Sequence, residues 1–257
     1  MKIAIITGAS SGIGKEFALE MDRGFHNIDA FWLISRRKEQ LEELADTLQH
    51  PCRILPMDIT LPASRQFLNM LLEAEAPQIC MLVNCAGYGI MGRFENQEIE
   101  EALGMIRLNC EALTAVTKLA LPYMRRGSRI IQLASSAAFL PQSQFAVYAA
   151  SKSYVLSFSR ALGAELKEKG VYVTSVCPGP VDTPFFDIAE KSGSTLRIKK
   201  LTMVSPDKVV KLALKDSYKR KSVSVCNPFI KAFALFSKMI PHDLMLNLMT
   251  YVEKLEK

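Results

Sequence analysis

Short apolar runs alternate with amphipathic, helix-length segments along most of this chain. Seven runs have the length and composition of buried parallel strands: Ile3–Ile6, Ala30–Ile34, Arg53–Met57, Ile79–Val83, Arg129–Ala134, Val171–Cys177 and Ser222–Val225. The segments with helical spacing are Ile13–Arg23, Glu39–Leu48, Ala63–Ala74, Glu98–Arg125 and Val147–Lys169. This alternation predicts the α/β class, with a doubly wound, Rossmann-type parallel sheet that carries helices on both faces.

The chain has 257 residues, no linker rich in Pro, Gly or Ser, and no internal repeat. A chain of this length can bury a sizeable core as one domain. We therefore expect a single domain over residues 1–227 and a helical C-terminal extension over residues 228–257. Apolar residues recur in the extension at helical spacing: Phe229, Ala232, Phe233, Phe236, Leu244, Leu248, Val252 and Leu255. Such a stripe favours packing on the body or on a partner subunit, with peripheral membrane contact as the alternative.

Cysteine usage and the N-terminus indicate the compartment. The six cysteines are scattered without a Cys-x-x-Cys pair, so we expect no metal site and treat the thiols as small apolar side chains. Four apolar residues precede Thr7, which is too few for a signal-peptide core. No run approaches the length of about 18 uncharged apolar residues that a spanning helix needs. These features predict a cytoplasmic protein.

The formal net charge of +6 is unevenly distributed. Residues 191–231 contain eleven Lys or Arg and two Asp or Glu. This basic stretch has few aromatic residues to stack on bases and no recognisable nucleic-acid motif, so no nucleic-acid partner is expected. A solvated basic face is the favoured interpretation, with phosphate or anionic lipid as the alternative.

A glycine-rich turn follows the first predicted strand directly. Its sequence is Thr7-Gly8-Ala9-Ser10-Ser11-Gly12-Ile13-Gly14, and an amphipathic helix comes next. Glycines at these positions let the backbone turn tightly and let a pyrophosphate approach the N–H groups at the helix start. The position between strand and helix favours a dinucleotide site over a plain connecting turn.

The second predicted strand ends at Ser35-Arg36-Arg37. A carboxylate at this strand end would bind the ribose hydroxyls of NAD(H). Two guanidinium groups suit a 2′-phosphate instead, which favours NADP(H) over NAD(H). The alternative is that the arginines simply face water at the start of a helix.

Of the seven tyrosines, only Tyr148 has a lysine four residues later, Lys152. That spacing places both side chains on one face of a helix. An ammonium group beside a phenol stabilises the phenolate and is expected to lower the pKa of Tyr148 from its ordinary value of about 10. Such a tyrosine can exchange a proton with a carbonyl oxygen. Ser135, thirteen residues upstream at the end of the fifth strand, is placed to hold the same oxygen.

Together these motifs resemble the short-chain dehydrogenase/reductase family, from residue 2 to about residue 185. The resemblance implies four catalytic positions, with Tyr148 as acid or base and Asn109 supporting a proton relay: Asn109, Ser135, Tyr148 and Lys152. It implies cofactor contacts from the glycine turn and the first three strand ends: Gly8, Ser10, Ser11, Gly12, Ile13, Gly14, Arg36, Asp58 and Ile59. The remaining implied cofactor contacts are Asn84, Ala86, Gly87, Tyr148, Lys152, Pro178, Gly179, Val181 and Thr183. Asp58 matches the residue that touches adenine, and Thr183 the one that holds the carboxamide.

Three positions depart from the family pattern. Cys85 replaces the second Asn of an Asn-Asn-Ala-Gly segment. Ser11 stands where some NADP-dependent members carry a basic residue, so the expectation of NADP(H) rests on Arg36. Ser136 adjoins Ser135 and is the alternative for the catalytic serine.

The resemblance implies an NADP(H)-dependent oxidoreductase that transfers a hydride between nicotinamide and a carbonyl or secondary-alcohol carbon. It also implies a homodimer or homotetramer. An NADP(H)-binding regulatory or sensor protein without turnover is the alternative, and the intact Ser135, Tyr148 and Lys152 set argues against it. The residues expected near the substrate are mostly apolar: Tyr88, Ile90, Met91, Phe139, Leu140, Phe145, Phe185 and Phe186. They favour a lipophilic small-molecule substrate, although several could be ordinary core. Residues 182–204 are expected to form a mobile lid.

Overall fold

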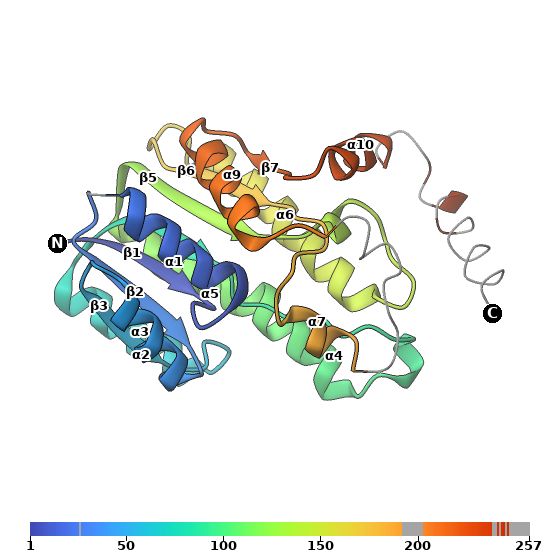
Figure 1. Ribbon diagram of the computed structural model, residues 1–257, viewed down its shortest axis with the longest axis horizontal. Helices are drawn as coiled ribbons and strands as arrows, with labels where there is room; N and C mark the ends of the chain where they lie inside the picture. The colour runs from blue at the N-terminus through green and yellow to red at the C-terminus, as the bar shows by residue number, and fades with distance from the viewer. Residues whose placement is uncertain (26, 192–202, 238–240, 242, 245, 247–257) are drawn as a thin grey trace.

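The computed structural model describes residues 1–25, 27–191, 203–237, 241, 243, 244 and 246. Its centre is a parallel sheet of seven strands in the order β3-β2-β1-β4-β5-β6-β7 (Figure 1). The strands are β1 Lys2–Thr7, β2 Ala30–Ser35, β3 Cys52–Pro56, β4 Gln78–Asn84, β5 Met124–Leu133, β6 Tyr172–Val176 and β7 Val223–Ser224. The sequence prediction of a doubly wound parallel sheet in one domain is therefore confirmed, including each of the seven strands.

Helices cover both faces of the sheet. Three helices precede β4 in the chain: α1 Gly12–Gly24, α2 Lys38–Thr47 and α3 Pro62–Glu75. Between β4 and β5 lie α4 Ile99–Ile106 and α5 Leu113–Ala120. The later helices are α6 Ala146–Glu165, α7 Phe185–Ala189, α9 Pro206–Tyr218 and α10 Pro228–Phe236. Strand β1 shows that both faces of the sheet are apolar. Ala4 and Ile6 belong to the core cluster on one face, and Ile3 and Ile5 belong to the cluster on the other face.

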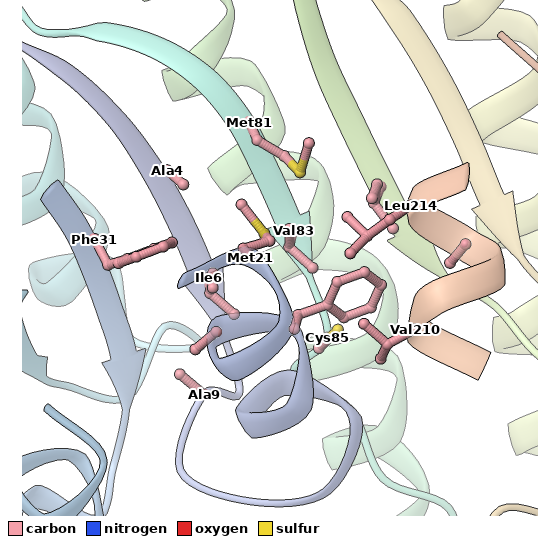
Figure 2. Close-up of a cluster of buried hydrophobic side chains, with 14 of the residues drawn as sticks. Ala4, Ile6, Ala9, Met21, Phe31, Met81, Val83, Cys85, Val210 and Leu214 are labelled. Atoms are coloured by element: carbon pink, nitrogen blue, oxygen red, sulfur yellow. The ribbon is translucent and has the colours of Figure 1, made fainter. Parts of the chain in front are cut away.

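The first cluster is shown in Figure 2, where Met21 of α1 and Val210 and Leu214 of α9 pack over Ile6 and Val83 of the central strands. The second cluster lies under α3, α5 and α6. All of these strand residues are fully buried or nearly so. Apolar burial on both faces explains why the strands read as continuous apolar runs rather than as alternating ones.

The helix predicted over 98–125 is confirmed from Ile99 to Ala120, but its hydrogen-bond pattern changes part-way and it ends earlier than predicted. Between α4 and α5, residues Arg107–Ala112 form a π-helical turn, here η2, and Leu121–Tyr123 form a 3-10 turn. Pro122 lacks the N–H that an α-helix needs, and β5 already begins at Met124. The helix predicted over 147–169 ends at Glu165. Helices α7 and α9 were not predicted.

The C-terminal extension begins with α10, as predicted, at Pro228. Its predicted apolar positions 248, 252 and 255 lie outside the described residues, as do residues 192–202 of the predicted lid. Within the described part of the chain, no helix combines the length and apolarity needed to cross a bilayer.

Candidate active site

Tyr148 and Lys152 share one face of α6, as their spacing predicts, and both are buried. The Lys152 ammonium nitrogen lies 5.7 Å from the centroid of the Tyr148 ring. Ser135 follows β5, and its hydroxyl lies close enough to the Tyr148 phenol to lower the pKa of that phenol. Its hydroxyl oxygen also accepts the Ala137 N–H at 3.1 Å. The fold therefore places near one another the three side chains that the sequence analysis grouped: Ser135, Tyr148 and Lys152.

The pKa of Tyr148 differs from the expectation. Burial raises it to about 12, and the nearby Ser135 hydroxyl offsets this only in part. The Lys152 ammonium group donates to the Leu133 carbonyl oxygen at 2.7 Å, and its nitrogen lies beside the Tyr148 ring, 5.7 Å from the centroid. Burial also lowers the pKa of Lys152 to about 8, against the opposing effect of nearby cysteines. The predicted depression of the Tyr148 pKa by Lys152 is thus wrong for this arrangement, because desolvation dominates.

Asn109 lies fully buried in the π-helical turn η2. Its amide nitrogen donates to the Tyr88 carbonyl at 2.9 Å and to the Ser151 hydroxyl at 3.0 Å, and its oxygen accepts the Tyr88 N–H at 3.1 Å. Ser151 in turn donates to the Tyr148 carbonyl oxygen at 2.7 Å. Asn109 therefore ties the loop after β4 to the helix that carries Tyr148. Ser151 was missed, although its position three residues after Tyr148 placed it on the same helix face.

Gly87 explains how closely these groups approach. A Cβ atom at this position would lie 2.8 Å from the Asn109 amide oxygen and 3.3 Å from the Lys152 nitrogen. The absence of a side chain therefore lets the loop after β4 pass directly over both polar groups.

The glycine turn meets two other strand ends. Gly8 has a φ of +69°, and a Cβ there would lie 2.8 Å from the Ala86 nitrogen. A Cβ at Gly12 would lie 3.3 Å from Thr183. Ser11 caps α1 without a side-chain capping hydrogen bond, and a helix start leaves its first N–H groups open to an anion. The glycines therefore let the turn pack closely against the segments after β4 and β6, and the open N–H groups at the start of α1 are available to a pyrophosphate.

The two arginines after β2 behave differently. Arg37 donates to the Ser10 hydroxyl from Nε at 3.1 Å and Nη2 at 2.8 Å, and from Nη2 to Ser11 at 2.6 Å. The Arg36 side chain is 75% exposed and lies 4.0 Å from the Asp58 carboxylate. The Arg37 guanidinium therefore contacts the glycine turn, and the Arg36 guanidinium lies near the segment after β3. The expectation of NADP(H) rests on Arg36, whereas Arg37 is the one that contacts the turn.

The remaining predicted cofactor residues divide into surface and interior positions. Asp58 accepts hydrogen bonds from the backbone and hydroxyl of Thr60, and its neighbour Ile59 is buried. Asn84 is buried, and its amide group donates to Thr117 and Gln132 at 3.0 Å each. In this structure Asn84 therefore organises polar groups beneath the strand ends.

The loop after β6 lies next to the turn that follows Ser135. The Pro178 carbonyl accepts the Ser136 N–H at 2.8 Å, which joins this loop to the turn after Ser135. Val181 is buried and forms a parallel bridge with Val204. Gly179 has Ile230 of α10 against its backbone. The predicted residues 178–183 thus line the end of the sheet beside Ser135.

An apolar cluster surrounds the Tyr148 ring. The Phe145 ring stacks on it with centroids 4.2 Å apart, and the Phe185 ring lies at 5.5 Å. Other predicted substrate residues complete the cluster: Tyr88, Ile90 and Met91. Phe139 instead packs in a different cluster beneath α6, so it belongs with the ordinary core.

Comparison with known proteins places this site in a family. Residues 2–192 match the family model described as short chain dehydrogenase. The chain belongs to the short-chain dehydrogenase/reductase family. An uncharacterized oxidoreductase of Staphylococcus epidermidis is 33% identical over 185 residues, which cover 71% of this chain and 79% of that protein. The short-chain dehydrogenase of Sphingobium yanoikuyae, solved in complex with NADPH, is 28% identical with a TM-score of 0.78 and 95% of each chain covered.

A very-long-chain 3-oxoacyl-CoA reductase of Pyrenophora tritici-repentis is 33% identical over 199 residues. These residues cover 74% of this chain and 58% of that protein. Membership in the short-chain dehydrogenase/reductase family makes this chain an oxidoreductase with a nucleotide-binding, Rossmann-like fold.

Proposed function

We propose that this chain is an NADP(H)-dependent oxidoreductase that interconverts a lipophilic carbonyl compound and its secondary alcohol. The observation that carries the proposal is the buried Tyr148 phenol, which has the Ser135 hydroxyl and the Lys152 ammonium group beside it. A protein that only sensed the cofactor would need no phenol placed in this way. Turnover is therefore favoured over the regulatory alternative.

A bound nicotinamide dinucleotide supplies the hydride for reduction and accepts it in oxidation. The residues of this chain orient the substrate and transfer the proton. With a pKa of about 12, the Tyr148 phenol stays protonated at neutral pH and suits a general acid in reduction. The Ser135 hydroxyl would bind the substrate carbonyl oxygen that receives the proton from Tyr148. Asn109 joins the loop after β4 to the backbone of Tyr148 through Ser151, and Lys152 lies beside the same loop at Gly87.

Two guanidinium groups support NADP(H) as the cofactor. Arg36 and Arg37 follow β2, where the ribose of a bound dinucleotide is expected. Arg37 already donates to the hydroxyls of Ser10 and Ser11 in the glycine turn. This places a positive charge beside Ser11, the position where some NADP-dependent members carry a basic residue. A relative of known structure, that of Sphingobium yanoikuyae, is described with NADPH.

The surroundings of Tyr148 support a lipophilic substrate. Phe145 and Phe185 contact its ring, and Ile90 and Met91 belong to the same apolar cluster. An aromatic or aliphatic ketone or a 3-oxoacyl group would meet apolar side chains around the reacting carbon. The fungal relative named as a 3-oxoacyl-CoA reductase is consistent with this class.

We also assign a homo-oligomer through α4 and α6. Ile99 of α4 is 70% exposed, and Leu103 and Ile106 are exposed on the same helix. Beside them lies a hollow of about 470 Å³, lined by Phe94, Ile106, Cys110, Ala146, Val147, Ala150 and Ser151. Exposed apolar patches of this kind are typical of subunit interfaces. Light scattering of the full chain would contradict this assignment if it gave the mass of a monomer.

Calorimetry with NADPH and NADH tests the cofactor, and a ketone screen tests turnover. We expect NADPH to bind at least about tenfold more tightly, a difference of about 1.4 kcal/mol. Arg36→Ala should narrow that difference, and oxidation of NADPH should follow on adding a lipophilic ketone. Equal affinities would exclude the NADP(H) assignment, and binding without turnover of any ketone would favour the regulatory alternative.

A further inference from the structure

Helix α10 is the most exposed apolar element of the described chain. None of its nine residues is buried. Phe229 is 76% exposed, and Leu235 and Phe236 are also exposed. Residues 229, 232 and 236 recur at helical spacing and form one outward stripe, with Lys231 beside it. Figure 1 shows α10 projecting beyond β7 at the edge of the molecule.

The opposite side of α10 is held by the body. Ile230 packs against the cluster that contains Val225 and Cys177, and it lies 3.1 Å from the position a Gly179 Cβ would take. The Asn227 side chain caps the helix by accepting the Phe229 N–H at 2.8 Å. The helix is thus anchored on one side and open on the other. Its outward orientation is a fixed feature of the fold rather than a free tail.

Lys231 lies on α10 itself and is exposed. Residues 203–231 contain seven Lys or Arg and two Asp. Lys208, Lys215 and Lys219 are exposed along α9, which precedes α10. Both Lys208 and Lys231 act electrostatically on Cys226, directly before α10, together with Asp207. Two lysines, Lys208 and Lys231, therefore lie near the start of the apolar helix, together with Asp207.

We propose that α10 inserts its Phe229, Leu235 and Phe236 side chains into the surface of an anionic lipid bilayer. Apolar side chains on a helix lying in the interface, with basic residues beside it, are the features that such surfaces select. The helix would lie in the headgroup region and would not cross the bilayer. This surface is independent of the cofactor and substrate assignments above.

A second copy of the chain fits this face less well. At 1.5 Å per residue, nine residues extend about 14 Å, and only one side of that helix is open. A stable subunit interface takes about 800 Å² from each partner, which this stripe cannot supply alone. Interfacial binding requires only a few inserted side chains and the attraction of nearby lysines. Charge complementarity thus favours lipid over a second copy that carries the same basic residues.

Membrane binding at α10 would also place the site beside the lipid surface. Gly179 belongs to the loop that the proposed function assigns to the nicotinamide, and Ile230 of α10 touches it. A lipophilic substrate partitioned into the bilayer would then lie close to Tyr148. This consequence rests on the proposed function, whereas the binding itself does not.

Vesicle flotation of the full chain tests the proposal. We expect binding to phosphatidylcholine vesicles that contain phosphatidylglycerol and little binding to phosphatidylcholine alone. Binding should weaken from about 0.1 M to about 1 M salt, where the screening length falls from about 10 Å to about 3 Å. The double variant Phe229→Ser with Phe236→Ser should lose at least tenfold in affinity. Phe67→Ser with Met70→Ser, which alters an exposed apolar pair on α3, should bind as the unmodified chain does.

Fluorescence gives a second readout that does not depend on flotation. Trp32 is the single tryptophan and is fully buried, so a Phe236→Trp variant adds one exposed reporter. Its emission should shift to the blue with anionic vesicles and be quenched by brominated lipids. The proposal is overturned if the α10 double variant binds like the α3 control, or if no anionic vesicle is bound. It is also overturned if α10 variants convert an oligomer to a monomer, because a second copy would then cover the helix.

Discussion

The guanidinium group of Arg37 lies 2.6 Å from the hydroxyl oxygen of Ser11, in the turn between β1 and α1. We expect Arg37→Ala to weaken NADPH binding about tenfold, or about 1.4 kcal/mol, and to leave NADH binding unchanged. The reason is that only NADPH carries the 2′-phosphate that a guanidinium group can bind through two N–H donors. Calorimetry with both cofactors measures the difference in affinity. Arg37→Lys is the matched variant, because it keeps the positive charge but lacks the paired N–H donors of the guanidinium group. An equal loss for both cofactors would show that Arg37 supports the turn rather than the phosphate.

Lys152 gives the site its pH dependence. Burial lowers its pKa to about 8, so the ammonium form prevails below that pH and the neutral amine above it. A positive charge beside the Tyr148 ring favours release of the phenol proton. The rate of ketone reduction should therefore fall as pH rises through about 8, well before the phenol of Tyr148 titrates near its pKa of about 12. Carbon NMR of the Lys152 side chain measures the pKa directly, with Lys152→Arg to assign the signal. A Lys152 signal that titrates near its ordinary value of about 10.4 would refute this account of the profile.

Asn109 holds the loop after β4 through both atoms of its amide group. Asn109→Ala leaves the partly buried N–H and C=O of Tyr88 without these partners, which should reduce stability by about 1–3 kcal/mol. We expect kcat to fall at least about tenfold as proton transfer is disturbed, with a smaller change in cofactor affinity. Asn69→Ala removes a half-buried asparagine on α3 whose side chain donates to Glu73, and it should change neither kcat nor cofactor affinity. Unchanged kcat in a destabilised Asn109→Ala protein would limit Asn109 to a structural role.

Asp22 links α1 to the segment before β3. Burial alone would raise its pKa, but hydrogen bonds from the Gln49 and His50 backbones and the His50 ring bring the pKa below its ordinary value. A carboxylate with a lowered pKa stabilises the fold above its unfolded pKa of about 3.9 and loses that effect as pH falls through the folded pKa. Asp22→Asn should therefore unfold about 1–3 kcal/mol more easily at pH 7, and the difference should shrink toward about pH 2. Urea unfolding with the exposed Asp46→Asn as control tests this, and a constant difference at all pH values would contradict it.

The sheet could be predicted because its strands are buried on both faces, which leaves an unmistakable apolar run such as Ile3–Ile6. The helix over 98–125 could not be divided from the sequence. Apolar spacing continues through Arg107–Ala112, and a π-helical turn is decided by hydrogen bonds that the spacing does not encode. Pro122 was the one local signal that the helix had to stop.

The site shows the same division between local and tertiary information. Tyr148 and Lys152 were predictable because four residues on a helix fix their common face. Which arginine reaches the glycine turn was not, because that depends on how the loop after β2 packs against Ser10 and Ser11. The raised pKa of Tyr148 was missed for a similar reason, since burial is a property of the folded chain rather than of the spacing to Lys152.

Replacement of Tyr148 by Phe is the most direct test of the account. The variant keeps the ring that stacks on Phe145 and removes only the hydroxyl group. With a lipophilic ketone that the unmodified chain reduces, Tyr148→Phe should lose at least about a hundredfold in kcat. Its NADPH affinity and thermal midpoint should stay close to those of the unmodified chain. If Tyr148→Phe retained near-normal turnover, Tyr148 would not be the proton donor and the proposed mechanism would be wrong.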